Sequence, residues 1–331
     1  MYMRINKRKI SAIISIMVML CLNACASDVP QTDNVQQDET AQSYDAQDKE
    51  QTVPVNVTEE TVEVDGLDRE YDIFFLADSH ISLCDDRDPD LMEKAASRSP
   101  MFKADGIEAW DRFDALMAAS RESDMVILGG DIIDSAMYAS IDHVKEQLDK
   151  LTVPYLYSMG NHDFEYGSEY FSPTAYEQYL PRLNDMRDDS PYQVREYDDL
   201  IIFTADDDNS QIDPPILEAY RSEAAKGKPI VLVVHVPIEP ATGDDTLTEK
   251  CKEVWGPSAD GRSRVTMGVN GCYPNDTTRE FIDLVLADDS PVVLVLAGHI
   301  HFYHKDMLND NVVQIVTGAA YEGDALKIRL K

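Results

Sequence analysis

The sequence between residues 71 and 80 is YDIFFLADSH. Its first six residues, Tyr71–Leu76, form a nearly continuous apolar run, as expected for a short strand that is covered on both faces. The run leads into Asp78-Ser79-His80, and both a carboxylate and an imidazole can bind a metal. We therefore interpret this stretch as a buried strand whose end carries candidate ligands.

Four other apolar runs end in the same manner, namely Met125–Leu128, Tyr155–Tyr157, Ile230–Val234 and Val292–Leu296. The segments that follow them are Gly129-Gly130-Asp131, Gly160-Asn161-His162-Asp163, His235-Val236-Pro237 and Gly298-His299-Ile300-His301. Ligands of open α/β sheets bind beyond the carboxyl ends of the strands. We therefore expect the five strand ends to meet on one rim.

Helical patterns separate several of these runs. Apolar residues recur at helical spacing in Ile107–Ser120, Ala136–Leu151 and Thr277–Leu286. Two further runs, Leu200–Phe203 and Val312–Val316, resemble buried strands. The alternation of strands and helices predicts an α/β domain.

The histidines concentrate at these strand ends. Five of the seven in the chain lie in the motifs quoted above. Of the other two, His143 belongs to a charged amphipathic helix and is interpreted as a surface residue. His304 follows the last motif and is interpreted as an ordinary strand residue.

The candidate ligands are Asp78, His80, Asp131, Asn161, His235, His299 and His301. Their oxygen and nitrogen donors suit Mn²⁺, Fe or Zn²⁺. Seven donors are too many for one ion but fit two divalent ions that share a carboxylate, which can clamp both oxygens of an in-line displacement. Glycines before Asp131, Asn161 and His299 allow sharp turns close to the ions.

In this order, the motifs resemble those of the calcineurin-like metallophosphoesterases, over about residues 70–304. The resemblance implies a four-layer α-β-β-α sandwich with a di-metal site at the carboxyl ends of the strands. It also implies that Asp78, His80 and His301 hold one ion. Asn161, His235 and His299 would hold the other, and Asp131 would bridge the two. A hydroxide on the metals would be the nucleophile.

The resemblance gives His162 a different role, as the general acid that protonates the leaving alkoxide. In related enzymes the residue three positions after the bridging aspartate orients this histidine, and here that residue is Asp134. An alternative role for Asp134 is the N-cap of a helix that begins near Ser135. Asp163 is interpreted as structural rather than catalytic.

The motifs depart from those of the protein Ser/Thr phosphatases, which have Arg-Gly after the second motif and Gly-Asn-His-Glu in the third. Here Ser135-Ala136 follow Asp134, and Asp163 stands in place of the glutamate. The resemblance therefore favours small phosphodiesters or phosphomonoesters as substrates. We expect two long segments, residues 81–106 and 239–278, to wall the substrate pocket, or else to be unrelated surface excursions.

The amino terminus predicts export. Residues 1–24 combine a basic start with an apolar run, as in a secretory signal peptide. Leu22-Asn23-Ala24-Cys25 resembles a lipobox, so Cys25 would carry lipid and hold an exported lipoprotein on a membrane. We interpret residues 25–68 as an acidic, flexible tether and residues 69–331 as the phosphoesterase domain, although the weak alternation of residues 53–64 also fits an edge strand.

The formal net charge of −33 makes nucleic acid a poor substrate, because the chain repels polyanions at long range. A nuclease therefore remains a minor alternative. A second alternative is a degenerate surface lipoprotein that binds metal without turnover. In an exported protein Cys251 and Cys272 could pair, and nothing in the sequence indicates an oligomeric state.

Overall fold

The computed structural model describes residues 52–164, 173–207, 210–239, 247–257, 265–268 and 274–331. The predicted signal peptide, Cys25, most of the predicted tether and Cys272 lie outside the described residues. The thiol of Cys251 is buried in helix α6 (Leu247–Trp255) and forms no disulfide with the residues that the structure describes. Among the helices that the structure describes, none has both the length and the apolar character needed to cross a bilayer.

The first sheet has five strands in the order β1-β13-β2-β3-β4. Its strands are β1 (Asn56–Val62), β2 (Tyr71–Leu76), β3 (Met125–Leu128), β4 (Tyr155–Tyr157) and β13 (Asp324–Leu330). The neighbours β2, β3 and β4 are parallel, so their carboxyl ends lie on the same edge. The bounds of these three strands are those predicted from the apolar runs.

The second sheet has six strands in the order β11-β12-β10-β7-β6-β5. They are β5 (Tyr192–Glu196), β6 (Ile201–Ala205), β7 (Ile230–Val233), β10 (Val292–Ala297), β11 (His304–Met307) and β12 (Val313–Val316). The four central strands are parallel and the two edge strands antiparallel. A small parallel pair joins β8 (Ile238–Glu239) to β9 (Met267–Gly268).

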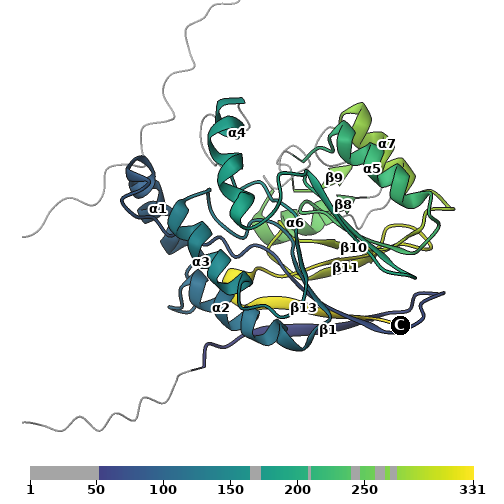
Figure 1. Ribbon diagram of the computed structural model, residues 1–331, viewed down its shortest axis with the longest axis horizontal. Helices are drawn as coiled ribbons and strands as arrows, with labels where there is room; N and C mark the ends of the chain where they lie inside the picture. The colour runs from purple at the N-terminus through teal and green to yellow at the C-terminus, as the bar shows by residue number, and fades with distance from the viewer. Residues whose placement is uncertain (1–51, 165–172, 208–209, 240–246, 258–264, 269–273) are drawn as a thin grey trace, which may run out of the picture. The chain divides into compact units, whose positions relative to one another are not determined.

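Helices cover the outer face of each sheet (Figure 1). On the first sheet lie α2 (Ala109–Ala119) and α3 (Tyr138–Leu148), and on the second lie α5 (Pro214–Ala224) and α7 (Asp276–Val285). The remaining helices are α1 (Met92–Arg98), α4 (Pro173–Tyr179) and α6. Helix α7 begins where the side chain of Asn275 accepts a hydrogen bond from the Thr278 amide at 2.8 Å.

Three apolar clusters confirm the predicted four-layer sandwich. The middle cluster joins the inner faces of the two sheets through side chains such as Phe75 and Ile127 on one side and Val233 and Leu296 on the other. A second cluster packs α2 and α3 on the first sheet, and a third packs α5 and α7 on the second sheet. The layers therefore follow the order α-β-β-α.

The boundary predicted at residue 69 is wrong. Residues 56–62 form β1, which pairs in parallel with β13 from Asn56–Asp324 to Val62–Leu330. The weak alternation of residues 53–64 therefore marks an edge strand rather than a linker. Only one face of this strand is covered, so polar side chains interrupt its apolar pattern.

Candidate metal and catalytic site

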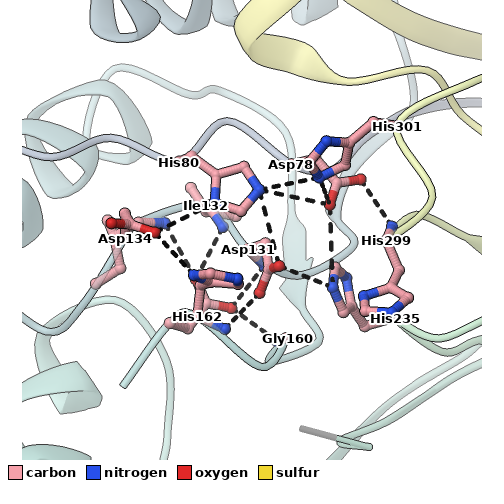
Figure 2. A network of polar contacts seen from close by, with 12 residues as sticks. Asp78, His80, Asp131, Ile132, Asp134, Gly160, His162, His235, His299 and His301 are labelled. Atoms are coloured by element: carbon pink, nitrogen blue, oxygen red, sulfur yellow. Dashed lines mark hydrogen bonds and ion pairs between the residues drawn. The ribbon is translucent and has the colours of Figure 1, made fainter. Parts of the chain in front are cut away.

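The five predicted strand ends meet at one place. The ends of β2, β3, β4, β7 and β10 bring Asp78, His80, Asp131, His162, His235, His299 and His301 together (Figure 2). The sandwich positions them because the three ligand-bearing strands of the first sheet face two strands of the second across the middle cluster. Residues that are up to 223 positions apart in the chain thus share one rim.

The backbone at this rim is unusual. Eight non-glycine residues have positive φ in the part of the chain that the structure describes, and five of them are predicted ligands: Asp78 (59°), His80 (48°), Asp131 (52°), His299 (73°) and His301 (56°). Such left-handed conformations cost of the order of 1–3 kcal/mol each and cluster at functional sites. The conformation turns each chain sharply away from its strand, so that adjacent side chains reach the same centre.

Asp78, His80 and His301 form the first donor group. The two Nε2 atoms of His80 and His301 face each other at 3.2 Å, and Asp78 Oδ1 lies 3.4 Å from that of His301. The second oxygen of Asp78 accepts the backbone N–H of His299 at 2.8 Å, which fixes the carboxylate with Oδ1 toward the imidazoles. The three donor atoms therefore lie within 4.8 Å of one another.

Asp131, His235 and His299 form the second donor group. Asp131 Oδ2 lies 3.1 Å from His235 Nε2 and 3.8 Å from His80 Nε2, so this oxygen stands between the two groups. The other oxygen of Asp131 accepts the backbone N–H of His162 at 2.6 Å. Asp131 Oδ2 therefore lies within 4 Å of a donor nitrogen from each group.

Asp163 holds the loops that carry these ligands. Its buried carboxylate accepts hydrogen bonds from the Gly160 amide (2.7 Å), the Tyr157 hydroxyl (2.8 Å) and the amides of residues 131, 132 and 133 (2.8–3.1 Å). Asn161 thereby lies in a short turn between two anchored residues. A Cβ on Gly160 would collide with the backbone and carboxylate of Asp131, so this position requires glycine.

Neighbouring groups orient the imidazoles. His235 Nδ1 lies 2.9 Å from the Gly129 carbonyl, which can only accept, so Nδ1 carries the hydrogen and Nε2 faces the site. Burial opposes protonation of His235, but the carboxylates of Asp131 and then Asp78 outweigh it and raise its pKa to about 10. For His80, burial dominates and lowers the pKa. A divalent cation at the second group would replace the proton of His235.

Asp134 is not a helix cap, since α3 begins at Tyr138 with Met137 at its N-cap. Instead its buried Oδ1 lies 2.8 Å from His162 Nδ1, and Arg98 donates to both of its oxygens. Burial opposes ionisation of Asp134, but the hydrogen bonds from Arg98, His162 and His80 outweigh it and hold its pKa far below the usual range. The structure thus supports the orienting role for Asp134.

Sequence reasoning did not single out Arg98 or Asp207. Asp207 follows β6 and accepts the backbone N–H groups of His235 and Val236, each at 2.9 Å, and burial raises its pKa to about 7. The signal for Asp207 was available, because Asp206-Asp207 follow an apolar run as the other motifs do. Arg98 carries no comparable signal, because it ends a short polar helix.

Parts of both predicted pocket walls lie at the site. From residues 81–106, which contain α1 and two 3-10 helices, Phe102 stacks on His80 with ring centroids 4.1 Å apart. From residues 239–278, the exposed Trp255 lies edge-to-face on His301 at 5.8 Å. Arg262 and Arg264 of the second segment lie outside the described residues. Tyr321, which sequence reasoning also missed, packs on His301 at 5.5 Å.

Two buried atoms test whether cations fit these groups. Asp78 Oδ1 and His235 Nε2 are shielded from solvent, and beyond their close approach to His301 and Asp131 neither forms a hydrogen bond of good geometry with a described residue. Leaving such groups unsatisfied is costly, whereas oxygen and imidazole donors of this kind satisfy divalent cations. The residues therefore fit metal ions at both groups.

The sequence profile of the calcineurin-like phosphoesterases matches residues 71–303, from the first strand of the site to just beyond its last ligand. The chain belongs to the calcineurin-like phosphoesterase family. It is accordingly a hydrolase that acts on phosphoric ester bonds. The family assignment made from the order of the motifs is confirmed.

Several solved structures are similar to this phosphoesterase. A dimetal phosphatase from Danio rerio shares 14% identity with a TM-score of 0.48, over 76% of this chain and 88% of that one. A purple acid phosphatase from seeds of yellow lupin (Lupinus luteus) shares 13% with a TM-score of 0.45, over 79% and 46%. Among curated proteins, no sequence match was found.

Proposed function

We propose that the protein hydrolyses a small phosphodiester or phosphomonoester with the help of two divalent cations, outside the cytoplasm. The observation that carries this proposal is the pair of donor groups that share the rim, with Asp131 between them. Family membership supplies the reaction class, and the two groups supply a place for the ions. The metal could be Mn²⁺, Fe or Zn²⁺.

Each residue has a definite part in this proposal. Asp78, His80 and His301 would hold one cation, Asn161, His235 and His299 the other, and Asp131 both. When bound, such a pair of cations supplies Lewis acidity to the phosphoryl oxygens and brings the pKa of water toward neutrality. The chain itself fixes the separation and orientation of the ligands through Asp163, Asp207 and the Gly129 carbonyl.

His162 would act as the general acid. Asp134 holds its Nδ1 at 2.8 Å, and the backbone N–H of His162 is fixed on Asp131 at 2.6 Å. With Nδ1 occupied by Asp134, a proton can leave from Nε2 toward the departing oxygen. The ring lies edge-on to the His80 ring, with centroids 4.8 Å apart, so it adjoins the first donor group.

Metal content and turnover test the proposal together. Loaded with Mn²⁺, the protein should cleave 4-nitrophenyl phosphate or bis(4-nitrophenyl) phosphate, and EDTA should abolish the activity. Asp131→Ala should lose both metal and activity. His162→Ala should keep its metal and lose about 10²–10⁴-fold in rate on an ester with a poor leaving group.

His143→Ala is the matched control, because this helix histidine pairs with Asp114 at 2.9 Å away from the rim. Its activity should equal that of the wild type. Full activity in Asp131→Ala would refute the assignment of the site. Stoichiometric metal with no turnover on any phosphoester would favour a degenerate metal-binding protein.

The pocket would be walled by Phe102 and Trp255, which adjoin ligands of the first donor group. An exposed indole beside the site favours a planar or apolar group in the substrate. A panel of phosphate esters compared between the wild type and Trp255→Ala tests this. Identical preferences across the panel would exclude Trp255 from substrate binding.

The location of the protein is proposed from its amino terminus. Residues 1–24 would direct export, and lipid on Cys25 would tether the domain to a membrane. Cys25→Ser should then move the protein from the membrane fraction to the soluble fraction. Equal membrane retention of the variant would contradict lipid anchoring at this residue.

A further inference from the structure

Arg98 lies in the segment that follows the first motif, against the acid–base pair formed by Asp134 and His162. It is the last residue of α1, and its side chain is only 15% exposed. Nε donates to Asp134 Oδ2 at 2.7 Å and a terminal nitrogen donates to Asp134 Oδ1 at 2.8 Å. This is a two-pronged guanidinium–carboxylate pair, which fixes both the position and the plane of the carboxylate.

The guanidinium and the imidazole converge on one oxygen. The same terminal nitrogen of Arg98 lies 3.3 Å from His162 Nδ1, and both nitrogens approach Asp134 Oδ1 at 2.8 Å. A carboxylate oxygen can accept both bonds, so Arg98 and His162 lie side by side on one shared acceptor. Any rotation of Asp134 would break the pair with Arg98 and displace the ring of His162.

The segment that carries Arg98 is itself fixed to the site. Phe102, four residues further along, stacks on the ligand His80 with an interplanar angle of 4°. The Arg98 guanidinium lies 5.1 Å from the centre of the Phe102 ring. One short segment therefore contacts a metal ligand through Phe102 and the acid–base pair through Arg98.

We propose that Arg98 is a positioning residue for proton donation by His162. By fixing the plane of Asp134, it holds His162 Nδ1 in place so that Nε2 faces the leaving oxygen. In this step the oxygen of a hydroxide forms a bond to phosphorus, while the bond between phosphorus and the leaving oxygen breaks and leaves its electron pair on that oxygen. The Nε2–H bond breaks with it, and a new O–H bond forms on the leaving group, while Arg98 keeps all its protons. This inference rests on the proposed function of His162 as the general acid.

A direct role in binding the substrate phosphate is less well supported. Two nitrogens of the Arg98 guanidinium, Nε and one terminal nitrogen, already donate to Asp134. The other terminal nitrogen lies 4.0 Å from the sulfur of Met101. A substrate phosphate would have to compete with the buried Asp134 carboxylate for the guanidinium of Arg98.

Leaving-group dependence separates these roles. A nitrophenolate departs without protonation, whereas an alkoxide requires it, so loss of the general acid affects mainly the alkyl ester. With the Mn²⁺-loaded full chain, Arg98→Ala should slow an alkyl phosphate by about a hundredfold and 4-nitrophenyl phosphate by less than about tenfold. Metal content should stay unchanged, and His162→Ala should show the same selectivity.

Three further variants complete the test. The double variant Arg98→Ala/His162→Ala should be no slower than His162→Ala, because both changes remove the same proton donation. Arg98→Lys replaces Arg98→Ala if the alanine variant fails to fold, because it keeps the buried positive charge. Lysine contacts the Asp134 carboxylate at a single point, so this variant should recover only part of the rate. Arg87→Ala is the control, since this arginine of the same segment pairs with Asp85 and Asp142.

Two outcomes would overturn the inference. An equal loss on both esters with a raised KM would make Arg98 a phosphate-binding residue. Additive losses in the double variant would place Arg98 outside the action of His162. By contrast, a His162→Ala variant without leaving-group selectivity would refute the general-acid assignment itself, whatever Arg98 does.

Discussion

The carboxyl ends of the strands and the bodies of the same strands follow different rules. Along their bodies, the strands bury continuous apolar side chains in ordinary extended conformations. At their ends, candidate ligands such as His80 and Asp131 adopt left-handed conformations, and several buried polar atoms form no hydrogen bond with the described residues. The bodies therefore supply stability, and part of it offsets the strain held at the rim.

The largest effect on activity is expected for a substitution at Gly298, which lies on the rim. A Cβ there would lie 2.6 Å from Asp78 Oδ2, the oxygen that accepts the His299 amide. Gly298→Ala should push these two ligand segments apart and lower activity by at least about a hundredfold, since a misplacement near 1 Å can cost that much. Metal content and kcat/KM of the purified variant measure this.

Gly227 provides the matched substitution away from the rim. It has a φ of +71° with open space around its Cβ position. Gly227→Ala should cost about 1–2 kcal/mol of folding free energy through left-handed strain and leave kcat/KM unchanged. If Gly298→Ala kept full activity, the close approach of the two segments at the rim would not be required for activity.

The next effect concerns a strand-covering helix. Phe281 of α7 is fully buried and packs on Tyr220 of α5 with ring centroids 5.0 Å apart. Phe281→Ala should lower the free energy of unfolding by about 3–5 kcal/mol, because it leaves a cavity in the outer layer. Urea unfolding measures the loss, and kcat/KM well below the melting temperature should match that of the wild type. A large loss of activity in the folded variant would show that packing away from the rim also determines activity.

The smallest effect is expected at a partly exposed pair between strand bodies. Arg329 of β13 donates two hydrogen bonds to its cross-strand partner Asp72, at 2.8 and 2.9 Å. These bonds outweigh desolvation and lower the pKa of Asp72 below its ordinary 3.8. The pair therefore stabilises the fold above that ordinary pKa, and the stabilisation is lost as the pH falls through the lowered value.

Arg329→Met should accordingly lower the free energy of unfolding only slightly near neutral pH, because both side chains contact solvent. The difference from the wild type should shrink at acid pH. Unfolding curves recorded at both pH values provide the measurement. A difference that grew toward acid pH would show that Asp72 contributes through its neutral form instead.

The same contrast explains what could be predicted from the sequence. Strands β2, β3 and β4 were predicted with their observed bounds because burial on both faces leaves an unbroken apolar run. Strand β13 has the sequence DALKIRL, whose charges interrupt the apolar pattern. It was missed even though it occupies an interior position of the first sheet.

The site divides in a similar way. Its ligand-bearing motifs are short local sequences at strand ends, so they could be recognised one by one. Arg98 reaches Asp134 across 36 positions of the chain from a helix with little apolar character, MEKAASR. No local pattern encodes that contact, because it depends on how the segment after the first motif packs on the rim.

The position of β13 also bears on how the domain assembles during synthesis. In the first sheet, β13 lies between β1 and β2, so β1 has no strand partner in this sheet until β13 is present. A ribosome delivers residues 324–330 after every other strand that the structure describes. The nascent chain must therefore keep residues 56–62 unpaired, and the outer edge of β2 open, until β13 emerges. A chain stopped before residue 324 would expose both edges to unwanted pairing with other chains.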